Sequence, residues 1–353
     1  MSERTSRRTG FGALMGALLL VAGLVAGGSP ASAGHRDEGT VVVANRAGGT
    51  LSLIDVATDT ATELAIPAPS GGFTPEPMYV VYTAGRVFVG DRANDRVVVY
   101  EPRHWTTVGE VATGAGVFHM WADPRGRQLW VNNDIDNTMT VIDPRSLEVE
   151  ATVPLPADLV ADGGRPHDVI LDRRSAHVTV VGLAGTDDAV VRFDLRTFEE
   201  KARAAVGKDP HVTLDPSRGD LFVASQNANE IAVLHRRTLE RLDTLSVPAA
   251  HGLDIDRRAR VVYTTNIAGG GSDALWAVDT RTGGILGDPV DAPFPTPHNI
   301  VLTAGNDKLY VTHSGLNAAQ VSVFGIDRRT RLPELVATVT VGPNPFGLEF
   351  VPR

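Results

Sequence analysis

Short runs of β-branched and aliphatic residues recur along this chain, each four to six residues long and bounded by Gly, Asp or Asn. A complete unit consists of residues 309–313 (LYVTH), 321–324 (VSVF) and 337–339 (ATV), followed by a segment rich in glycine and proline. Runs of this length between turn residues predict β-strands. No segment after residue 33 keeps an apolar period of 3.6, so we expect an all-β fold.

The unit repeats, and counting its copies predicts the architecture. Strands of one type, which we expect to be innermost, are spaced 40 to 48 residues apart and begin near Met78, His119, His167, His211, His251, His298 and Phe346. Groups of three further strands begin near Val41, Val87, Leu129, Val178, Leu221, Val261 and Leu309. Seven of each predict a seven-bladed β-propeller of four-stranded antiparallel blades.

The two ends of the repeat are complementary. The three-strand group at residues 41–66 has no inner strand before it, and the inner strand at residues 346–351 has no group after it. We therefore expect the C-terminal strand to pair with the N-terminal blade. This pairing closes the ring and leaves no open sheet edge, which would otherwise invite aggregation.

Residues 310–313 (YVTH) and 263–266 (YTTN) resemble the YVTN family of propeller repeats, and the resemblance extends over the whole chain after residue 33. It implies the propeller architecture but little about activity, because the wider superfamily includes metalloenzyme domains, lactonases, lyases and binding scaffolds. The N-terminal propeller of nitrous oxide reductase is similar in that it gathers histidines from several blades around copper. No cupredoxin domain follows here, which excludes that enzyme as a whole.

The N-terminal segment has the composition of a signal peptide. Three arginines precede an uncharged apolar segment at residues 11–27, and Ala-Ser-Ala at residues 31–33 supplies a cleavage site. We expect residues 1–33 to be removed after export by the twin-arginine or the general secretory route. A flexible segment, residues 34–40, and a single propeller domain, residues 41–353, then form a secreted protein without a membrane span.

Charge and composition narrow the function classes. The chain carries a formal charge of −9 at pH 7 and contains no cysteine. The acidity argues against nonspecific nucleic-acid binding, which depends on basic residues that neutralise phosphates. The lack of cysteine excludes disulfides, thiolate-bound metals and a cysteine nucleophile. We expect a monomer whose partner is a small molecule or a cell-envelope ligand.

Five histidines begin consecutive inner strands: His119, His167, His211, His251 and His298. The inner strands of a propeller line its axis, so these side chains are expected to converge at one face. Neutral imidazoles suit copper, zinc or iron, whereas magnesium and calcium prefer oxygen ligands. The pattern therefore predicts a transition-metal site formed by these five residues.

Two alternatives remain open for the histidines. Repeat duplication alone would also place a histidine at each strand start, in a structural role. In addition, His167, His251 and His298 lie five residues before a turn residue, whereas His119 and His211 lie four before one. If this difference lies in the turn, all five histidines occupy the same position on their strands and point the same way. If it falls in the strand, only three converge, because a one-residue shift turns a side chain to the other face.

Polar residues at the same face complete the candidate site. His313 ends a second strand and offers a sixth imidazole or, like His298, a general base; the alternative for His313 is a turn-capping role. The residues expected to contact a ligand at this face are Glu76, Asp168, Asn266 and Asn299.

Three function classes follow. The first is a metal-dependent enzyme, either an oxidoreductase or a hydrolase or lyase that uses metal-bound water or a histidine base. The second is a non-catalytic scaffold that binds a ligand or a protein. The third is a propeller lactonase or lyase, a class that holds a divalent cation through carboxylate and amide oxygens.

Overall fold

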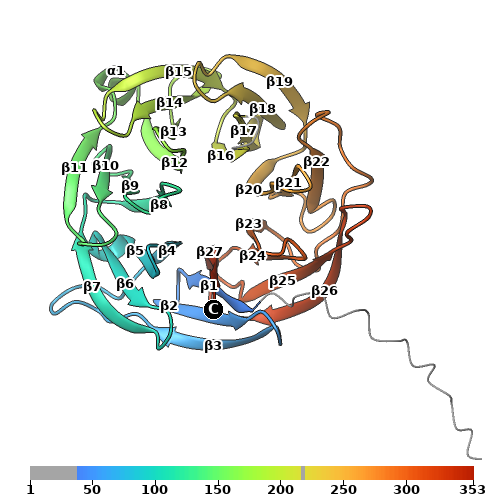
Figure 1. Ribbon diagram of the computed structural model, residues 1–353, viewed down its shortest axis with the longest axis horizontal. Helices are drawn as coiled ribbons and strands as arrows, with labels where there is room; N and C mark the ends of the chain where they lie inside the picture. The colour runs from blue at the N-terminus through green and yellow to red at the C-terminus, as the bar shows by residue number, and fades with distance from the viewer. Residues whose placement is uncertain (1–37, 216–218) are drawn as a thin grey trace, which may run out of the picture. The chain divides into compact units, whose positions relative to one another are not determined.

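The computed structural model describes residues 38–215 and 219–353, which form seven antiparallel sheets arranged in a ring (Figure 1). Six sheets have four strands and one has three. Within each sheet the strands follow the order of the sequence, except that β27 lies beside β1. The predicted seven-bladed propeller is confirmed.

Each blade extends from an innermost strand at the axis outward to the wall of the ring (Figure 1). Blade 1 contains β27 (Pro345–Pro352), β1 (Gly39–Asn45), β2 (Thr50–Asp55) and β3 (Thr60–Ala65). Blade 2 contains β4 (Pro77–Thr83), β5 (Arg86–Asp91), β6 (Arg96–Glu101) and β7 (Thr106–Ala112), and blade 3 contains β8 (Val117–Ala122), β9 (Leu129–Asn133), β10 (Thr138–Ile142) and β11 (Val149–Pro154). Blade 4 contains β12 (Arg165–Leu171), β13 (Ser175–Val181), β14 (Asp188–Asp194) and β15 (Glu200–Val206), and blade 5 contains β16 (Pro210–Asp215), β17 (Asp220–Ser225), β18 (Glu230–His235) and β19 (Arg241–Ser246). Blade 6 contains β20 (Ala250–Asp256), β21 (Val261–Asn266) and β22 (Leu275–Asp279), and blade 7 contains β23 (Pro297–Leu302), β24 (Lys308–His313), β25 (Gln320–Ile326) and β26 (Pro333–Thr340).

Blade 6 departs from the four predicted strands. Beyond β22 the chain forms only two isolated bridges, from Val278 to Ile285 and from Leu275 to Val290, where the other blades have an outer strand. Helices are equally sparse: within the described residues they are α1 (Ala157–Ala161) and the 3₁₀ turns η1 (Arg92–Asn94) and η2 (Gln226–Ala228). The all-β expectation therefore holds, with one blade shortened.

The ring closes through the pairing of β27 with β1, as predicted. Thr40 lies opposite Val351, and Val43 lies opposite Leu348. Because β1 begins at Gly39, the expectation of a flexible segment up to residue 40 is wrong at its C-terminal end. Residues 34–37 and the predicted signal peptide, residues 1–33, lie outside the described residues. No described helix has the length and apolar character needed to cross a bilayer.

The hydrophobic core is divided among the blade interfaces. Seven buried clusters lie between neighbouring blades, one for each interface of a closed ring. Trp130 of blade 3 and Phe193 of blade 4 belong to one cluster, and Val41 of blade 1 shares another with Tyr310 of blade 7. Each fully buried side chain of this size contributes roughly 1.5–3 kcal/mol. The fold is thus stabilised around its whole circumference.

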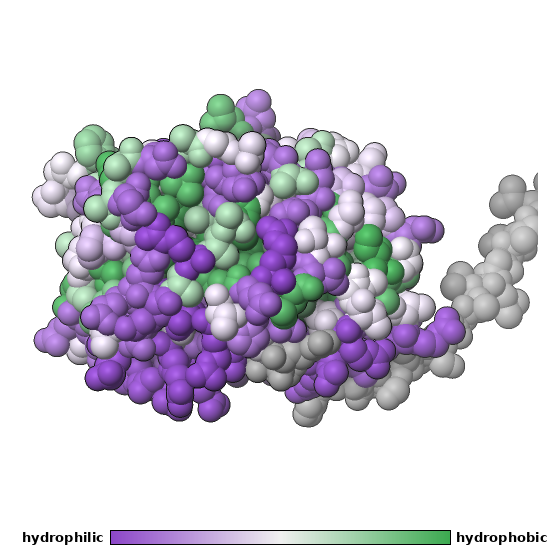
Figure 2. All heavy atoms as spheres, turned by 90° about the horizontal axis from the view of Figure 1, so that it is seen from above, coloured by the Kyte–Doolittle hydropathy of each residue, from purple (hydrophilic) through white to green (hydrophobic). Residues whose placement is uncertain are grey.

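The outermost strands are exposed along most of their length, as in β7 and β19. Seen from the side, the propeller accordingly shows hydrophilic and hydrophobic residues interspersed on its outer wall (Figure 2). The inner strands are buried almost throughout. Polar residues on inner strands therefore need a specific explanation.

Removing β27 should abolish cooperative unfolding. A chain that ends at Asn344 lacks the inner strand of blade 1, which leaves β1 as an open edge and removes apolar contacts with both neighbouring blades. Thermal unfolding followed by circular dichroism should then lose its single sharp transition. A control that lacks only Arg353 loses a surface ion pair with Asp55 and should lose at most about 1 kcal/mol. A cooperative transition retained without β27 would contradict the role of closure.

Candidate metal centre

A β-bulge near the start of the inner strand determines which side chains reach the propeller axis. In β12, the pairing partners of Pro166 and Val169 lie only two residues apart on β13. His167 and Asp168 therefore share one partner position, that of Thr179. The same shift occurs in six of the seven inner strands, and β16 is the exception. Bulges bend a strand and redirect its side chains.

The five predicted histidines do not share one structural position. His167, His251 and His298 are the first residue of their bulges, and His119 is the second residue of its bulge. His211 lies in β16, which has no bulge. The difference between four and five residues from the histidine to the following turn residue therefore arises within the strand and not in the turn. The expectation that only three histidines would then converge is wrong, because the bulge changes where successive side chains point.

All five imidazole rings meet in series at the axis. The centroid distances between successive rings are 5.4 Å from His119 to His167, 4.7 Å to His211, 3.8 Å to His251 and 4.6 Å to His298. His119 also lies 5.3 Å from His211, so the first three form a triangle. The side chain of His167 is 15% exposed, and those of His119 and His211 are more deeply buried.

His119, His167 and His211 have the spacing of a ligand set. Each offers one nitrogen such that the three nitrogens lie within 4.8 Å of one another. Nε2 of His167 and Nε2 of His211 are 3.2 Å apart. Two nitrogens bound to one zinc at about 2.0–2.1 Å in tetrahedral geometry would lie about 3.4 Å apart. The same 3.2 Å spacing suits a hydrogen bond in which one imidazole donates to the other.

Asp168 orients two of these imidazoles. Its Oδ1 lies 2.8 Å from Nδ1 of His119, and its Oδ2 lies 3.6 Å from Nδ1 of His211. The amides of Val169 and Val212 donate to the same carboxylate. Burial opposes ionisation of Asp168, but its two histidine neighbours outweigh burial and hold its pKa below the usual value. A carboxylate on Nδ1 leaves Nε2 of His119 for a metal, which is the usual arrangement of metal-binding histidines.

Among the five histidines at the axis, three buried ring nitrogens have no hydrogen-bond partner within the described part of the chain, namely Nε2 of His119 and both nitrogens of His251. A buried donor left without a partner costs about 1–3 kcal/mol. Burial lowers the pKa of His119, and it lowers the pKa values of His167, His251 and His298 further, with neighbouring histidines adding to the effect. These imidazoles are therefore neutral at pH 7, the form that binds metals.

Asp209 extends the cluster towards solvent. Its Oδ1 lies 3.6 Å from Nε2 of His167, and its side chain is 31% exposed. Asp209 directly precedes β16 and has a φ of 59°, a left-handed conformation that costs a non-glycine residue of order 1 kcal/mol or more. Ala249, Thr296 and Asn344 have the same left-handed conformation directly before their own inner strands, so it belongs to the repeat, and in blade 5 it places the Asp209 carboxylate beside His167.

His313 lies outside the cluster and has a structural role. Its Nε2 is 2.8 Å from the Ser322 hydroxyl, and its Nδ1 is 3.0 Å from the Pro295 carbonyl oxygen. Asn45 and Asn133, at the same place in their blades, make the corresponding contact to a hydroxyl of the next strand, at 2.9 and 2.8 Å. Both ring nitrogens of His313 are therefore engaged in holding its own blade together.

The other predicted ligand residues are dispersed. Glu76 forms an ion pair with Arg46 at 2.8 Å. The side-chain nitrogen of Asn299 lies 3.0 Å from Nδ1 of His298, so that nitrogen is already engaged. Asn266 is buried at the end of β21. Among these polar residues, only Asp168 contacts imidazoles of the three-histidine cluster, those of His119 and His211.

Sequence reasoning missed Tyr79, whose ring lies 3.6 Å from that of His119. Tyr79 is the second residue of the bulge in β4, the position that His119 occupies in β8. Its ring also contacts Phe118 and Phe346, each at 5.5 Å between centroids. Burial raises the pKa of Tyr79 well above its usual value, so its hydroxyl stays protonated. An aromatic wall thus encloses one side of the cluster.

Two acidic residues lie further along the inner strands, Asp254 on β20 and Glu349 on β27. Burial raises the pKa of Asp254 to about 6, although the amides of Leu302 and Ile255 donate to its carboxylate. Burial, with the charge of Asp254, raises the pKa of Glu349 well above its usual value. The axis therefore disfavours charge along its length.

Residues 59–159 match the family described as YNCE-like beta-propeller, in agreement with the predicted resemblance to propeller repeats. No curated protein matches the chain. Similar solved structures include the periplasmic gluconolactonase PpgL of Pseudomonas aeruginosa, at 16% identity and a TM-score of 0.67, covering 89% of this chain and 99% of that one. A protein from Lactobacillus plantarum has 16% identity and a TM-score of 0.70, with the same coverage. The dihydro-heme d1 dehydrogenase NirN has 14% identity and a TM-score of 0.60, covering 88% of this chain and 75% of that one. At these identities the likeness concerns the fold alone.

Replacing Asp254 with asparagine should change how stability depends on pH. The folded-state pKa of about 6 exceeds the unfolded value of 3.8, so the folded state binds more protons between these values. The contribution of Asp254 is therefore present in acid and is lost as pH rises through this window. Relative to the parent, the free energy of unfolding of Asp254→Asn should rise by on the order of 3 kcal/mol between pH 4 and pH 7. Denaturant titrations at several pH values measure this difference, and parallel pH profiles would rule it out.

Proposed function

We propose that this protein binds a transition-metal ion, copper or zinc, through His119, His167 and His211. In this proposal Asp168 fixes two of the imidazoles from behind, and Asp209 lies at the accessible side as a fourth donor. The observation that carries the proposal is the 3.2 Å spacing of two Nε2 atoms beside a third imidazole whose Nε2 is buried without a partner. A bound ion would satisfy all three nitrogens at once.

The donor chemistry favours copper and zinc over other ions. Three imidazoles and one carboxylate suit these metals, whereas magnesium and calcium need a shell of oxygens. Asp168 is a poor direct ligand, because two backbone amides and His119 already occupy its oxygens. Iron, the third metal considered from the sequence, is less favoured, since its common non-heme site has two histidines and one carboxylate, whereas three imidazoles meet here.

The lactonase alternative draws on a relative's name rather than on the site. PpgL is described as a gluconolactonase, but its similarity to this chain concerns the fold. A lactonase of the kind considered from the sequence holds its cation by oxygens, whereas nitrogens predominate here. The scaffold alternative explains the fold but leaves the unpartnered Nε2 of His119 without a role.

A metal ion at this site would allow the protein to catalyse a reaction on a ligand outside the cytoplasm. Zinc held by the three imidazoles alone, with Asp209 not coordinated, would keep a fourth position open, and water bound there would have its pKa lowered to about 7, which would provide a nucleophile for hydrolysis. Phe73, Ile135 and Leu316, on loops at the histidine face, are 71%, 62% and 80% exposed and offer apolar contacts to an organic ligand. The composition of residues 1–33 supports the part of the proposal that the protein acts outside the cytoplasm.

Zinc or copper should bind with a stoichiometry of one and stabilise the fold. A ligand at one hundred times its dissociation constant adds roughly 2.7 kcal/mol to stability. Calorimetric titration and melting curves on untagged protein should show both effects in the parent. The variant His119→Ala/His167→Ala/His211→Ala should lose them while still folding, because the blade interfaces hold the ring together.

His235→Ala is the matched control, because His235 hydrogen-bonds Thr238 at a surface turn of blade 5, away from the axis. This control should bind metal as the parent does. Equal binding by the triple variant would place the metal elsewhere, and the scaffold function would then stand.

Asp168→Asn should weaken metal binding roughly 10- to 100-fold, as expected when the group that orients a metal-bound histidine is changed. Asparagine keeps the size of the side chain but lacks the charge that holds Nδ1 of His119 protonated. Competition with a chelator of known affinity measures the change. A variant that folds like the parent and binds metal equally well would contradict the role assigned to Asp168.

A further inference from the structure

A large cavity lies at the end of the inner strands opposite the histidines. Its volume is about 950 Å³, and its lining comes from blades 3, 4, 5 and 6. Asp172 follows β12 at this end, whereas His167 lies at the other end of the same strand. Five residues of extended chain separate them by about 16 Å. The cavity is therefore separate from the candidate metal centre.

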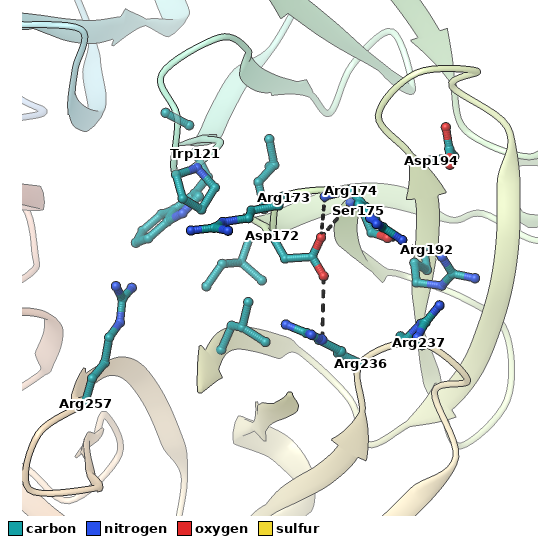
Figure 3. Close-up of a pocket in the computed structure, with 15 residues that line it drawn as sticks. Trp121, Asp172, Arg173, Arg174, Ser175, Arg192, Asp194, Arg236, Arg237 and Arg257 are labelled. Carbon is teal, nitrogen blue, oxygen red and sulfur yellow. Dashed lines mark hydrogen bonds and ion pairs between the residues drawn. The ribbon is translucent and has the colours of Figure 1, made fainter. Parts of the chain in front are cut away.

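The lining of this cavity is strongly basic, although the chain as a whole carries a charge of −9. Six arginines contribute to it: Arg173, Arg174, Arg192, Arg236, Arg237 and Arg257. Figure 3 shows Arg173 beside Trp121, and Arg257 on the opposite side of the space, from a different blade. Arginine stays charged at all relevant pH values. The fold thus gathers positive charge from the turns of three blades.

Acidic residues neutralise only part of this charge. The cavity has two aspartates, and each accepts hydrogen bonds from the backbone of its own turn, Asp172 from Arg174 and Ser175 and Asp194 from the two residues that follow Leu195. The nearest approach to an arginine side chain is 3.9 Å, from Asp172 to Nε of Arg236.

Other guanidinium groups in the cavity make no close ion pair, although the charge of Arg257 opposes the rise in the pKa of Asp254 that burial causes. Within the described residues Arg173, Arg237 and Arg257 form no ion pair, and their side chains are exposed. Nε of Arg192 is buried without any partner, while its Nη1 donates to the Ser175 hydroxyl at 3.2 Å. Like charges around one cavity repel one another, and an anion bound there would offset this repulsion.

The floor of the cavity is apolar. Ile170, Leu171 and Leu214 of the inner strands line it, and the indole of Trp121 is a large aromatic surface at its edge, 38% exposed. An apolar floor with a few charged groups around it is typical of small-molecule sites, which commonly enclose about 300–1,000 Å³. The size and the lining suit an organic anion better than a single inorganic ion.

We propose that this cavity binds an organic polyphosphate of nucleotide size, with its phosphates among the arginines and its planar group against Trp121. Phosphate groups carry up to two charges each and accept paired hydrogen bonds from guanidinium, so they match six arginines better than one or two carboxylates do. This second site goes beyond the proposed metal function and does not depend on it.

Calorimetric titration in metal-free buffer at physiological salt tests the site with tripolyphosphate and ATP. Both should bind the parent at one site and raise its melting temperature. Arg173→Gln/Arg257→Gln should weaken tripolyphosphate binding at least about tenfold, because two charge-assisted contacts are lost. Trp121→Ala should weaken ATP binding more than tripolyphosphate binding.

Arg329→Gln is the matched control, since Arg329 is exposed on a turn of blade 7 outside the cavity. It should bind both probes as the parent does. An equal loss in this control would mean nonspecific surface attraction and overturn the proposal, as would absence of binding or tighter binding of citrate than of tripolyphosphate. His119→Ala/His211→Ala should bind tripolyphosphate unchanged, and loss of binding there would place the anion at the other face. Failure of metal binding and failure of anion binding are therefore separately observable.

Discussion

The backbone pairing between β27 and β1 is the constraint on which the rest of the structure depends. It joins the two ends of the repeat in one sheet and so creates the seventh blade interface, with its own hydrophobic cluster. No cysteine is available to hold the ring by disulfides. Closure holds the inner strands of all seven blades around one axis, where side chains from blades 3, 4 and 5 meet at 3–5 Å.

Burial at the propeller axis disfavours charged side chains, and the rest of the fold has to offset this cost in folding free energy. Asp168 remains ionised only because imidazoles and two backbone amides surround it, whereas Asp254 and Glu349 have fewer such neighbours and therefore have raised pKa values. Burial lowers the pKa values of His251 and His298, so these imidazoles stay neutral. Functional sites often accept such local destabilisation, because the rest of the fold supplies the stability.

The fold could be predicted from the sequence because the strand pattern of a blade recurs seven times. An unclear pattern in one blade therefore does not change the number of blades predicted. The five histidines were found for the same reason. The contacts they make could not be predicted, since a bulge shifts His119 and Asp168 relative to the repeat in a way that apolar spacing does not report. Tyr79 and the arginine-lined cavity were missed because no single segment contains the residues that meet there.

The one inner strand without a bulge has a wider consequence. A propeller of identical blades would present the same side chain seven times around its axis, at equal radius and height. Blade 5 breaks this rotational symmetry by omitting a single residue, and His211 thereby approaches both His167 and His119. The chemistry at the axis of such a ring can therefore diverge through insertion or deletion of one residue in one blade, with amino-acid composition and hydrophobic core left almost unchanged.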